Sequence, residues 1–376
     1  MGVIDAEDIL KRVASQFQAE GSMEELVPYG SGHINDTFRL TCRLSDGGCK
    51  RYILQKMNTS IFKNTAELME NVEKVTSFLR KKIIEAGGNP ERETLNLVPA
   101  ADGRTYLESE GEFWRMYIFI ENATSFDEVK KPEDFYNSAV SFGNFQRLLA
   151  DYPAETLHET IMNFHNTADR FANFKKAVKE DVCGRAKAVQ DEIDFVLARE
   201  KDTHVICDAL AEKRIPLRVT HNDTKLNNIM IDDQTGKGLC VIDLDTVMPG
   251  SSLYDYGDSI RFGASTGAED EPNLELISLD LGLFDIYTKG YLEGCGGSLI
   301  KEEIELFPMG AKLMTFECGM RFLADYLQGD VYFKIHREGH NLDRARTQFK
   351  LVSDMESKWE EMTEIVRKYS GQALEK

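Results

Sequence analysis

Residues 220–228 read Thr-His-Asn-Asp-Thr-Lys-Leu-Asn-Asn, and twenty residues after the first aspartate the chain reads Val241-Ile242-Asp243. The order is H-x-D-x-K-x-x-N, followed by an apolar run that ends in a further aspartate. Five polar positions therefore stand in a fixed order around short apolar segments, which chance seldom produces. This order decides the fold class that the sequence predicts.

The same order is typical of the catalytic loop and the metal-binding aspartate in kinase-type phosphoryl transfer. In that chemistry Asp223 accepts the proton of the attacking hydroxyl, and Lys225 neutralises the moving phosphoryl group. Asn228 and Asp243 would bind Mg²⁺ between the phosphates. We therefore predict Asp223 and Lys225 as catalytic residues, Asn228 and Asp243 as metal ligands, and ATP and Mg²⁺ as cofactors.

The residues after Asn228 predict a β-hairpin. Residues 229–232 form a short, mostly apolar run, turn residues follow over 233–238, and an apolar run returns. If Asp232 pairs with Leu239, Asn228 lies opposite Asp243, and residues opposed across antiparallel strands have Cβ atoms roughly 4.5–5.5 Å apart. This register would let both side chains bind one Mg²⁺, an ion that accepts few protein ligands.

Length and composition indicate two lobes in a cytoplasmic protein. A chain of 376 residues is longer than one compact core usually supports. Its first residues are acidic where a signal peptide would be basic, and no apolar run reaches the roughly 18–20 residues of a transmembrane helix. The seven cysteines form no C-x-x-C pair, which is typical of reduced thiols. We expect no membrane partner.

The charge excludes one class of partner. The formal net charge is −19, from 45 basic and 64 acidic residues. Nucleic-acid binding depends on clustered Lys and Arg, so we expect no nucleic-acid partner. A negative field also suits a cationic substrate such as an aminoglycoside, although such a charge is most often a property of a well-solvated surface. We expect a monomer whose partners are ATP and a small molecule.

Hydrophobic periodicity predicts an α+β, protein-kinase-like fold of two lobes. We expect a helix over residues 5–20, strands over 37–44 and 51–56, a long helix over 65–86, and strands near 104–109 and 113–120. From residue 133 onward the pattern is mostly helical. The predicted lobes are a β-rich nucleotide-binding lobe, residues 1–121, and a mainly helical catalytic lobe, residues 122–376.

The first lobe carries the pattern of a nucleotide site with one departure. Gly30 and Gly32 lie between two predicted strands, where backbone N–H groups can approach phosphate oxygens. Gln55 occupies the position of the usual phosphate-binding lysine. Lys56 is next to it but should point to the opposite face of the strand. Either a local bulge redirects Lys56, or the phosphates are held without that lysine. Candidates for the acidic partner on the long helix are Glu70 and Glu73.

The motif resembles the aminoglycoside phosphotransferase and choline kinase group of small-molecule kinases. Longer strings are similar to bacterial N-acetylhexosamine 1-kinases, and the resemblance covers nearly the whole chain. Those strings are Tyr-Gly-Ser-Gly-His-Ile-Asn-Asp-Thr at 29–37, Tyr-Ile-Leu-Gln at 52–55, Met-Asn-Thr-Ser-Ile-Phe at 57–62, Arg-Val-Thr at 218–220, Ser-Ile-Arg-Phe-Gly-Ala-Ser-Thr at 259–266 and Glu-Cys-Gly-Met-Arg-Phe-Leu-Ala-Asp-Tyr-Leu at 317–327. Gln55 belongs to that subgroup's pattern as well.

The resemblance implies ATP- and Mg²⁺-dependent phosphorylation of the anomeric hydroxyl of N-acetylglucosamine or N-acetylgalactosamine. It implies that Asp223 is the base over the sugar and that residues from Tyr117 to Glu121 line the adenine. Asp255 and Asp258 would brace the catalytic loop. The remaining sugar contacts that it implies are His33, Phe262, Arg321 and Tyr332.

Other interpretations remain open. The chain could be a kinase for an aminoglycoside, choline or homoserine, or a non-catalytic pseudokinase, although the latter should have lost Asp223 or Asp243. Arg321 could be a structural ion-pair partner of Asp325, one turn along the same helix. A zinc site on two histidines of the region 158–165 would lack a third ligand.

Overall fold

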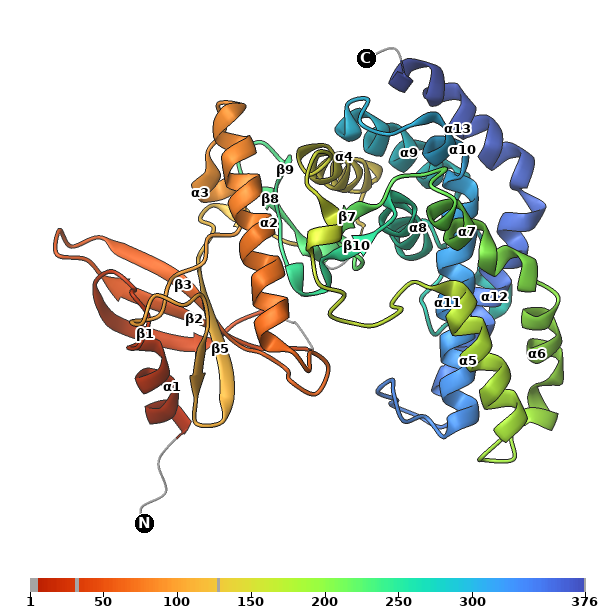
Figure 1. The fold of residues 1–376 in the computed structure, drawn as a ribbon, viewed down its shortest axis with the longest axis horizontal. Coiled ribbons are helices and arrows are strands. Elements are labelled where there is room, and N and C mark those ends of the chain that lie inside the picture. The colour runs from red at the N-terminus through yellow and green to blue at the C-terminus, as the bar shows by residue number, and fades with distance from the viewer. Residues whose placement is uncertain (1–5, 31–33, 127–128, 375–376) are drawn as a thin grey trace. The chain divides into compact units, whose positions relative to one another are not determined.

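The computed structural model describes residues 6–30, 34–126 and 129–374, and the chain forms two compact units (Figure 1). The first, residues 1–124 and 230–245, is here called the sheet unit. The second, residues 125–229 and 246–376, is here called the helical unit. The boundary that we expected after residue 121 is close to the first crossing, whereas residues 230–245 return to the sheet unit.

The sheet unit is built on a five-stranded antiparallel sheet in the order β1-β2-β3-β5-β4. Alternating residues of these strands face one core, which includes Leu40, Leu54 and Met116. The strands are β1 (Ser22–Pro28), β2 (Asp36–Arg43), β3 (Cys49–Lys56), β4 (Leu107–Ser109) and β5 (Glu112–Ile118). The strands predicted for this region are confirmed.

The helices of this unit differ in how well the sequence predicted them. α2 (Thr65–Glu85) has the predicted extent, begins at the N-cap Asn64, and buries Val72 and Val75. α1 (Ala6–Ala14) ends earlier than the helix predicted over residues 5–20. The reason is that Phe17, which the periodicity assigned to the helix, instead forms an isolated β-bridge with Ala100 and packs in the sheet core. α3 (Pro90–Glu93) is a single turn.

A second sheet in the order β6-β8-β9 contains the predicted hairpin. Its strands are β6 (Ala123–Thr124), β8 (Ile229–Asp232) and β9 (Gly238–Val241). The hairpin exists, but the predicted register is wrong, because the N–H of Asp232 donates to the carbonyl of Lys237 at 2.9 Å. Gly236 adopts a φ of 67° and donates to the carbonyl of Asp232, which closes a shorter turn than a pairing with Leu239 would require. The expectation that Asn228 lies opposite Asp243 depended on pairing Asp232 with Leu239, so it no longer follows.

The helical unit consists mainly of helices, as predicted for the region after residue 133, and α11 packs against α5, α8 and α12 (Figure 1). α8 approaches α11 closely, since a Cβ on Gly257 would meet the carbonyl oxygen of Gly310 at 2.2 Å. The helices are α4 (Pro132–Leu148), α5 (Thr167–Glu180), α6 (Gln190–Leu197), α7 (Val205–Ala211), α8 (Ser252–Gly263), α9 (Leu281–Cys295), α10 (Lys301–Glu305), α11 (Phe307–Gln328), α12 (His340–Ser357) and α13 (Trp359–Leu374).

A short antiparallel pair of strands in this unit leads into the motif. β7 (Arg218–Thr220) pairs with β10 (Met248–Gly250), with Thr220 opposite Met248. The segment 221–228 follows β7 directly and is here called the catalytic loop. Among the helices of the described residues, none is both long enough and apolar enough to cross a membrane.

Candidate active site

The backbone of the catalytic loop is held by one buried carboxylate. Asp255 on α8 accepts the N–H of His221 at 2.9 Å and the N–H of Asn222 at 2.8 Å. Asn222 has a φ of 65°, a left-handed conformation that asparagine tolerates better than most residues. Gln146 also donates to Asp255 at 2.8 Å. Burial raises the pKa of Asp255, and these hydrogen bonds oppose the rise by stabilising the carboxylate.

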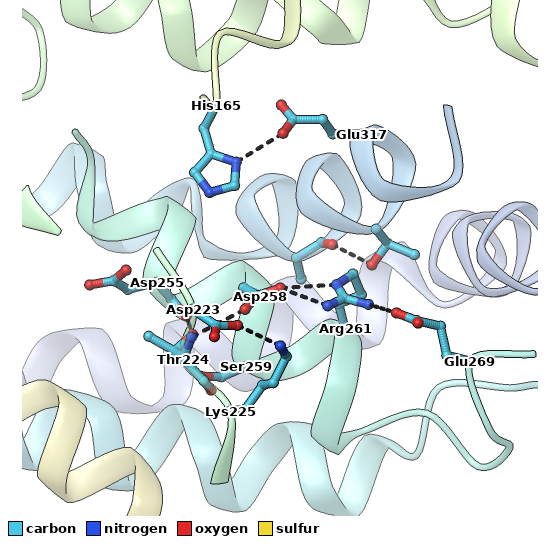
Figure 2. A network of polar contacts seen from close by, with 12 residues as sticks. His165, Asp223, Thr224, Lys225, Asp255, Asp258, Ser259, Arg261, Glu269 and Glu317 are labelled. Carbon is cyan, nitrogen blue, oxygen red and sulfur yellow. Dashed lines mark hydrogen bonds and ion pairs between the residues drawn. The ribbon is translucent and has the colours of Figure 1, made fainter. Parts of the chain in front are cut away.

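Residues in the next turn of α8 hold Thr224 of the catalytic loop. Asp258 accepts the N–H of Thr224 at 3.2 Å, and Ser259 donates to the Thr224 carbonyl at 2.9 Å. Arg261 binds Asp258 at 2.9 Å and Glu269 at 2.8 Å, so a chain of charges continues away from the loop (Figure 2). Burial alone would raise the pKa of Asp258, but the charges of Arg261 and Lys225 outweigh it and lower that pKa.

This clamp presents Asp223 together with Lys225 and Asn228. The Lys225 ammonium lies 2.8 Å from one Asp223 carboxylate oxygen, and the amide nitrogen of Asn228 lies 3.2 Å from the other. Asn228 also donates to the Asp223 carbonyl at 2.8 Å, which leaves its amide oxygen as the atom able to bind a cation. Partial burial would lower the pKa of Lys225, but the Asp223 carboxylate outweighs it and raises that pKa, so Lys225 is charged.

The remaining metal candidate belongs to the sheet unit. Asp243 is exposed and has a φ of 58°, and it stands two residues before the buried Asp245. Asp245 forms an ion pair with Arg115 and accepts a hydrogen bond from the Asn35 amide at 2.7 Å. The Asn35 side chain therefore anchors the segment that carries Asp243.

Oxygen ligands of these types suit Mg²⁺, which keeps waters and phosphate oxygens for most of its coordination sphere. Within the described residues no group of three or more His, Cys, Asp and Glu side chains is arranged to hold a metal ion. Asp243 of the sheet unit supplies a carboxylate and Asn228 of the helical unit supplies an amide oxygen, and both are ligand types that Mg²⁺ accepts.

The place of the usual phosphate-binding lysine is occupied by a hydrogen-bonded pair. Gln55 on β3 accepts from the Nε of Arg115 on β5 at 3.0 Å and donates to Thr37 at 3.1 Å. Pairing of β3 with both neighbours is regular through Lys56, so no bulge redirects that side chain. The Lys56 ammonium instead lies 3.2 Å from Glu112.

Arg115 is the cation that sequence analysis missed. Its side chain is 1% exposed, and its guanidinium lies 5.2 Å from the ring centroid of Tyr117. Burial would lower the pKa of Arg115, but the negative charge of Asp245 outweighs it and raises that pKa. A lone arginine in the apolar strand Phe-Trp-Arg-Met-Tyr-Ile, opposite Gln55, was the signal that could have revealed it.

The other nucleotide candidates lie in different surroundings. Gly30 is exposed with a φ of 80°, whereas Gly32 lies outside the described residues. Tyr117 is buried, and its hydroxyl has no hydrogen-bond partner within the described part of the chain. Glu121 pairs with Arg51, whose Nε lies 2.9 Å from one carboxylate oxygen.

The acceptor candidates of the helical unit gather partly on α11. The Arg321 guanidinium lies over three aromatic rings, at 5.6 Å from Phe164, 5.9 Å from Tyr332 and 5.4 Å from Phe333. Tyr332 is 65% exposed, and Phe262 is partly exposed on the last turn of α8. His33 lies outside the described residues.

The ion pair that we considered between Arg321 and Asp325 does not form. Asp325 accepts the backbone N–H groups of Val331, Tyr332 and Phe333 at 3.0, 2.8 and 3.0 Å. It therefore anchors the loop that carries the two rings beside Arg321. Within the described part of the chain Arg321 forms no ion pair, and its guanidinium lies over the three rings instead.

Comparisons with known proteins identify the family and the fold. A family model described as the phosphotransferase enzyme family matches residues 25–287, more than half of the chain. A microcompartment-associated aminopropanol kinase has a similar structure, with a TM-score of 0.62 and 14% sequence identity over 94% of this chain and 98% of that chain.

Two further structures show the same fold. An amicoumacin kinase in complex with AMP-PNP and Ca²⁺ gives a TM-score of 0.59 at 13% identity, covering 94% of each chain. A choline kinase from Cryptosporidium parvum gives 0.55 at 13% identity, covering 97% of this chain and 99% of that chain. The fold is thus the kinase-like α+β fold that the sequence predicted. Because the family model spans most of both units, the chain belongs to the phosphotransferase enzyme family of aminoglycoside- and choline-kinase-like proteins.

Proposed function

We propose that this protein is an ATP- and Mg²⁺-dependent kinase that phosphorylates the anomeric C1 hydroxyl of N-acetylglucosamine or N-acetylgalactosamine, giving the sugar 1-phosphate and ADP. The observation that carries the proposal is Asp223, presented by a clamped loop between the Lys225 ammonium and the Asn228 amide. A carboxylate held in this position can act as a general base.

The chemistry that these residues perform follows from their charges. Asp223 takes the proton of the acceptor hydroxyl, and that oxygen attacks the γ-phosphorus while the bond to the leaving ADP breaks. Lys225 stabilises the negative charge on the transferring group. Asn228 and Asp243 would hold Mg²⁺, which neutralises phosphate charge when bound. The use of a nucleotide and a divalent cation is supported by the amicoumacin kinase, whose structure contains AMP-PNP and Ca²⁺.

The choice of an N-acetylhexosamine rests on the sequence strings that resemble those kinases and on the wall around Arg321. A guanidinium without an ion-pair partner offers donors to neutral oxygen atoms, and the exposed Tyr332 ring offers a flat apolar surface to a sugar. Arg170 lies close enough for the charge of Arg321 to contribute, after burial, to a lowered pKa of Arg170. Two such cations disfavour a polycationic acceptor.

A second candidate is a kinase for an amino alcohol. The similar structures include an aminopropanol kinase and a choline kinase. The same Asp223 base would serve any alcohol. The side chains around Arg321, namely Phe164, Tyr332 and Phe333, are here called the acceptor wall, and they are what distinguishes the two proposals.

The decisive experiment is ADP release with ATP and Mg²⁺ over a panel of N-acetylhexosamines, hexoses, glucosamine, 1-amino-2-propanol, choline and kanamycin. We expect turnover with N-acetylglucosamine or N-acetylgalactosamine, and much less without the 2-acetamido group, since a site built to bind a polar group rejects analogues that lack it. Phosphorus NMR of the product should show coupling to H1. A product phosphorylated at C6, or turnover of amino alcohols alone, contradicts the proposal.

A further inference from the structure

His165 in the helical unit is a buried histidine with only one of its ring nitrogens bound. It precedes α5, is 8% exposed, and its Nδ1 lies 2.8 Å from a carboxylate oxygen of Glu317 on α11. Its Nε2 has no hydrogen-bond partner within the described part of the chain. Burying a polar group without a hydrogen bond is energetically unfavourable, so such a group requires an explanation.

The ring of His165 is fixed in orientation. Glu317 is 1% exposed, and its second carboxylate oxygen accepts from the hydroxyl of Thr167 at 2.6 Å. The rings of Phe164 and Tyr254 lie with centroids 4.4 and 5.1 Å from that of His165. When Nδ1–H donates to Glu317, the neutral ring carries its lone pair on Nε2. The arrangement therefore presents a hydrogen-bond acceptor in a set direction.

That direction is toward the catalytic loop. Figure 2 shows Nδ1 of His165 directed to Glu317 and the opposite edge of the ring facing the side on which Asp223, Asp258 and Lys225 lie.

The His165 ring also contacts the acceptor wall through Phe164. Arg321 lies over Phe164, and Phe164 packs against His165. Arg170 donates from Nε and a terminal nitrogen to the Phe164 carbonyl at 3.1 and 3.0 Å, which fixes the backbone between them. One wall therefore offers guanidinium donors from Arg321 and an imidazole acceptor from His165.

We propose that His165 is a substrate-binding residue whose Nε2 accepts a hydrogen bond from a hydroxyl of the acceptor, other than the hydroxyl that Asp223 deprotonates. Glu317 is then a positioning residue, which acts by holding the tautomer and the ring orientation. The inference rests on the proposed role of Asp223 as the base and narrows the acceptor to a polyhydroxylated molecule. The trimethylammonium group of choline has no hydrogen to donate to Nε2, so this wall favours a sugar.

The test separates the two ring nitrogens by substitution. In His165→Asn the side-chain amide replaces Nδ1 and can still donate to Glu317, but nothing replaces Nε2. We expect the KM for N-acetylglucosamine to rise by about tenfold, the effect of losing roughly 1.4 kcal/mol of binding, while the KM for ATP and the melting temperature stay unchanged. His165→Gln, whose amide reaches the Nε2 position, should recover part of the loss. The matched control is His204→Asn, an exposed histidine of the same unit, which should change neither KM.

A measurement on the wild-type protein avoids dependence on the variants. With histidine ¹⁵N-labelled and the His165 resonances assigned, saturating N-acetylglucosamine with ADP should shift the Nε2 resonance and leave Nδ1 nearly unchanged. An unchanged acceptor KM in His165→Asn, or an Nε2 resonance that does not respond, overturns the inference. If the wild type phosphorylates 1-amino-2-propanol or choline and no sugar, the proposed function and the inference both fail, because neither acceptor has a second hydroxyl to donate to Nε2. Sugar turnover with an unchanged acceptor KM in His165→Asn overturns the inference alone.

Discussion

Arg115 on β5 forms an ion pair with Asp245, and both side chains are almost completely buried in the sheet unit. The same guanidinium donates to Gln55, which stands where a kinase usually has its phosphate-binding lysine. Arg115 is too deeply buried to meet a nucleotide phosphate, and it acts instead on Asp245, two residues after Asp243. The positive charge of Arg115 therefore stabilises the segment that carries Asp243 and does not contact the nucleotide phosphates.

Replacing Arg115 with Met should strongly destabilise the protein. The substitution leaves the Asp245 carboxylate buried without a counter-charge, and breaking a buried ion pair in this way costs about 3–5 kcal/mol. Urea unfolding followed by circular dichroism measures the change in the free energy of unfolding. The control is Arg12→Ala, which removes an exposed pair with Glu110 and should cost about 0–1 kcal/mol. Equal losses in the two variants would contradict the role of the buried pair.

Replacing Lys56 with Ala should change the KM for ATP only slightly. The Lys56 ammonium is committed to Glu112 and Asp36, at 3.2 and 3.6 Å, on the face of β3 opposite Gln55. Because these pairs are partly exposed, stability should change by no more than about 1 kcal/mol. Steady-state kinetics with varied ATP provides the measurement. A collapse of kcat would show that Lys56 reaches the nucleotide after all.

Asp223→Asn should retain ATP binding and lose turnover. The asparagine side chain has nearly the same shape but accepts no proton, and loss of a general base lowers kcat by about 10²–10⁴-fold. Asp233→Asn, in the exposed hairpin turn of the sheet unit, is the matched control and should leave kcat unchanged. Single-turnover assays and nucleotide titration separate chemistry from binding. A variant with near-normal turnover would refute Asp223 as the base.

Asp243→Asn should raise the concentration of Mg²⁺ that activity requires. Asparagine tolerates the positive φ of residue 243, so the substitution removes charge with little backbone strain, whereas Ala would add strain. We expect the Mg²⁺ concentration at half-maximal rate to rise and kcat to fall, because the triphosphate charge is less well compensated. A Mg²⁺ titration that matches the wild type would exclude Asp243 as a ligand.

Glu317 should make stability depend on pH in acid. Burial would raise the pKa of Glu317, but His165 outweighs it and lowers that pKa below its ordinary value of 4.5. A depressed pKa contributes stability that is present above pH 4.5 and is lost as pH falls through the folded-state value. The difference in unfolding free energy between the wild type and Glu317→Gln should be constant near neutrality and shrink in acid. A difference that grows as pH falls would reverse this sign.

The catalytic loop was predictable because its residues are neighbours in the sequence. Asp223, Lys225 and Asn228 lie within six positions, and their contacts follow from the local chain path. The strands and α2 were predictable from periodicity. The hairpin register was not, because it depends on the left-handed conformation of Gly236 rather than on the apolar pattern.

The supporting contacts were hidden because they join residues far apart in the chain. Arg115 and Asp245 are 130 residues apart, and His165 and Glu317 are 152 apart. In sequence alone Arg115 and Glu317 are polar residues within apolar runs, and several partners are available to each of them. Only the packing of β5 against the segment after β9, and of α11 beside residue 165, selects one.

The separation of Arg115 from Asp245 also bears on the order of events during synthesis. At about 5–20 residues per second, a ribosome needs roughly 6.5 to 26 s to add the 130 residues that separate them. During that interval Arg115, which is buried in the folded protein, has been synthesised, but its ion-pair partner Asp245 has not. Residues 125–229 of the helical unit are made in the same interval. Synthesis of the sheet unit therefore begins first, but the counter-charge of its buried Arg115 is added only when Asp245 has been synthesised.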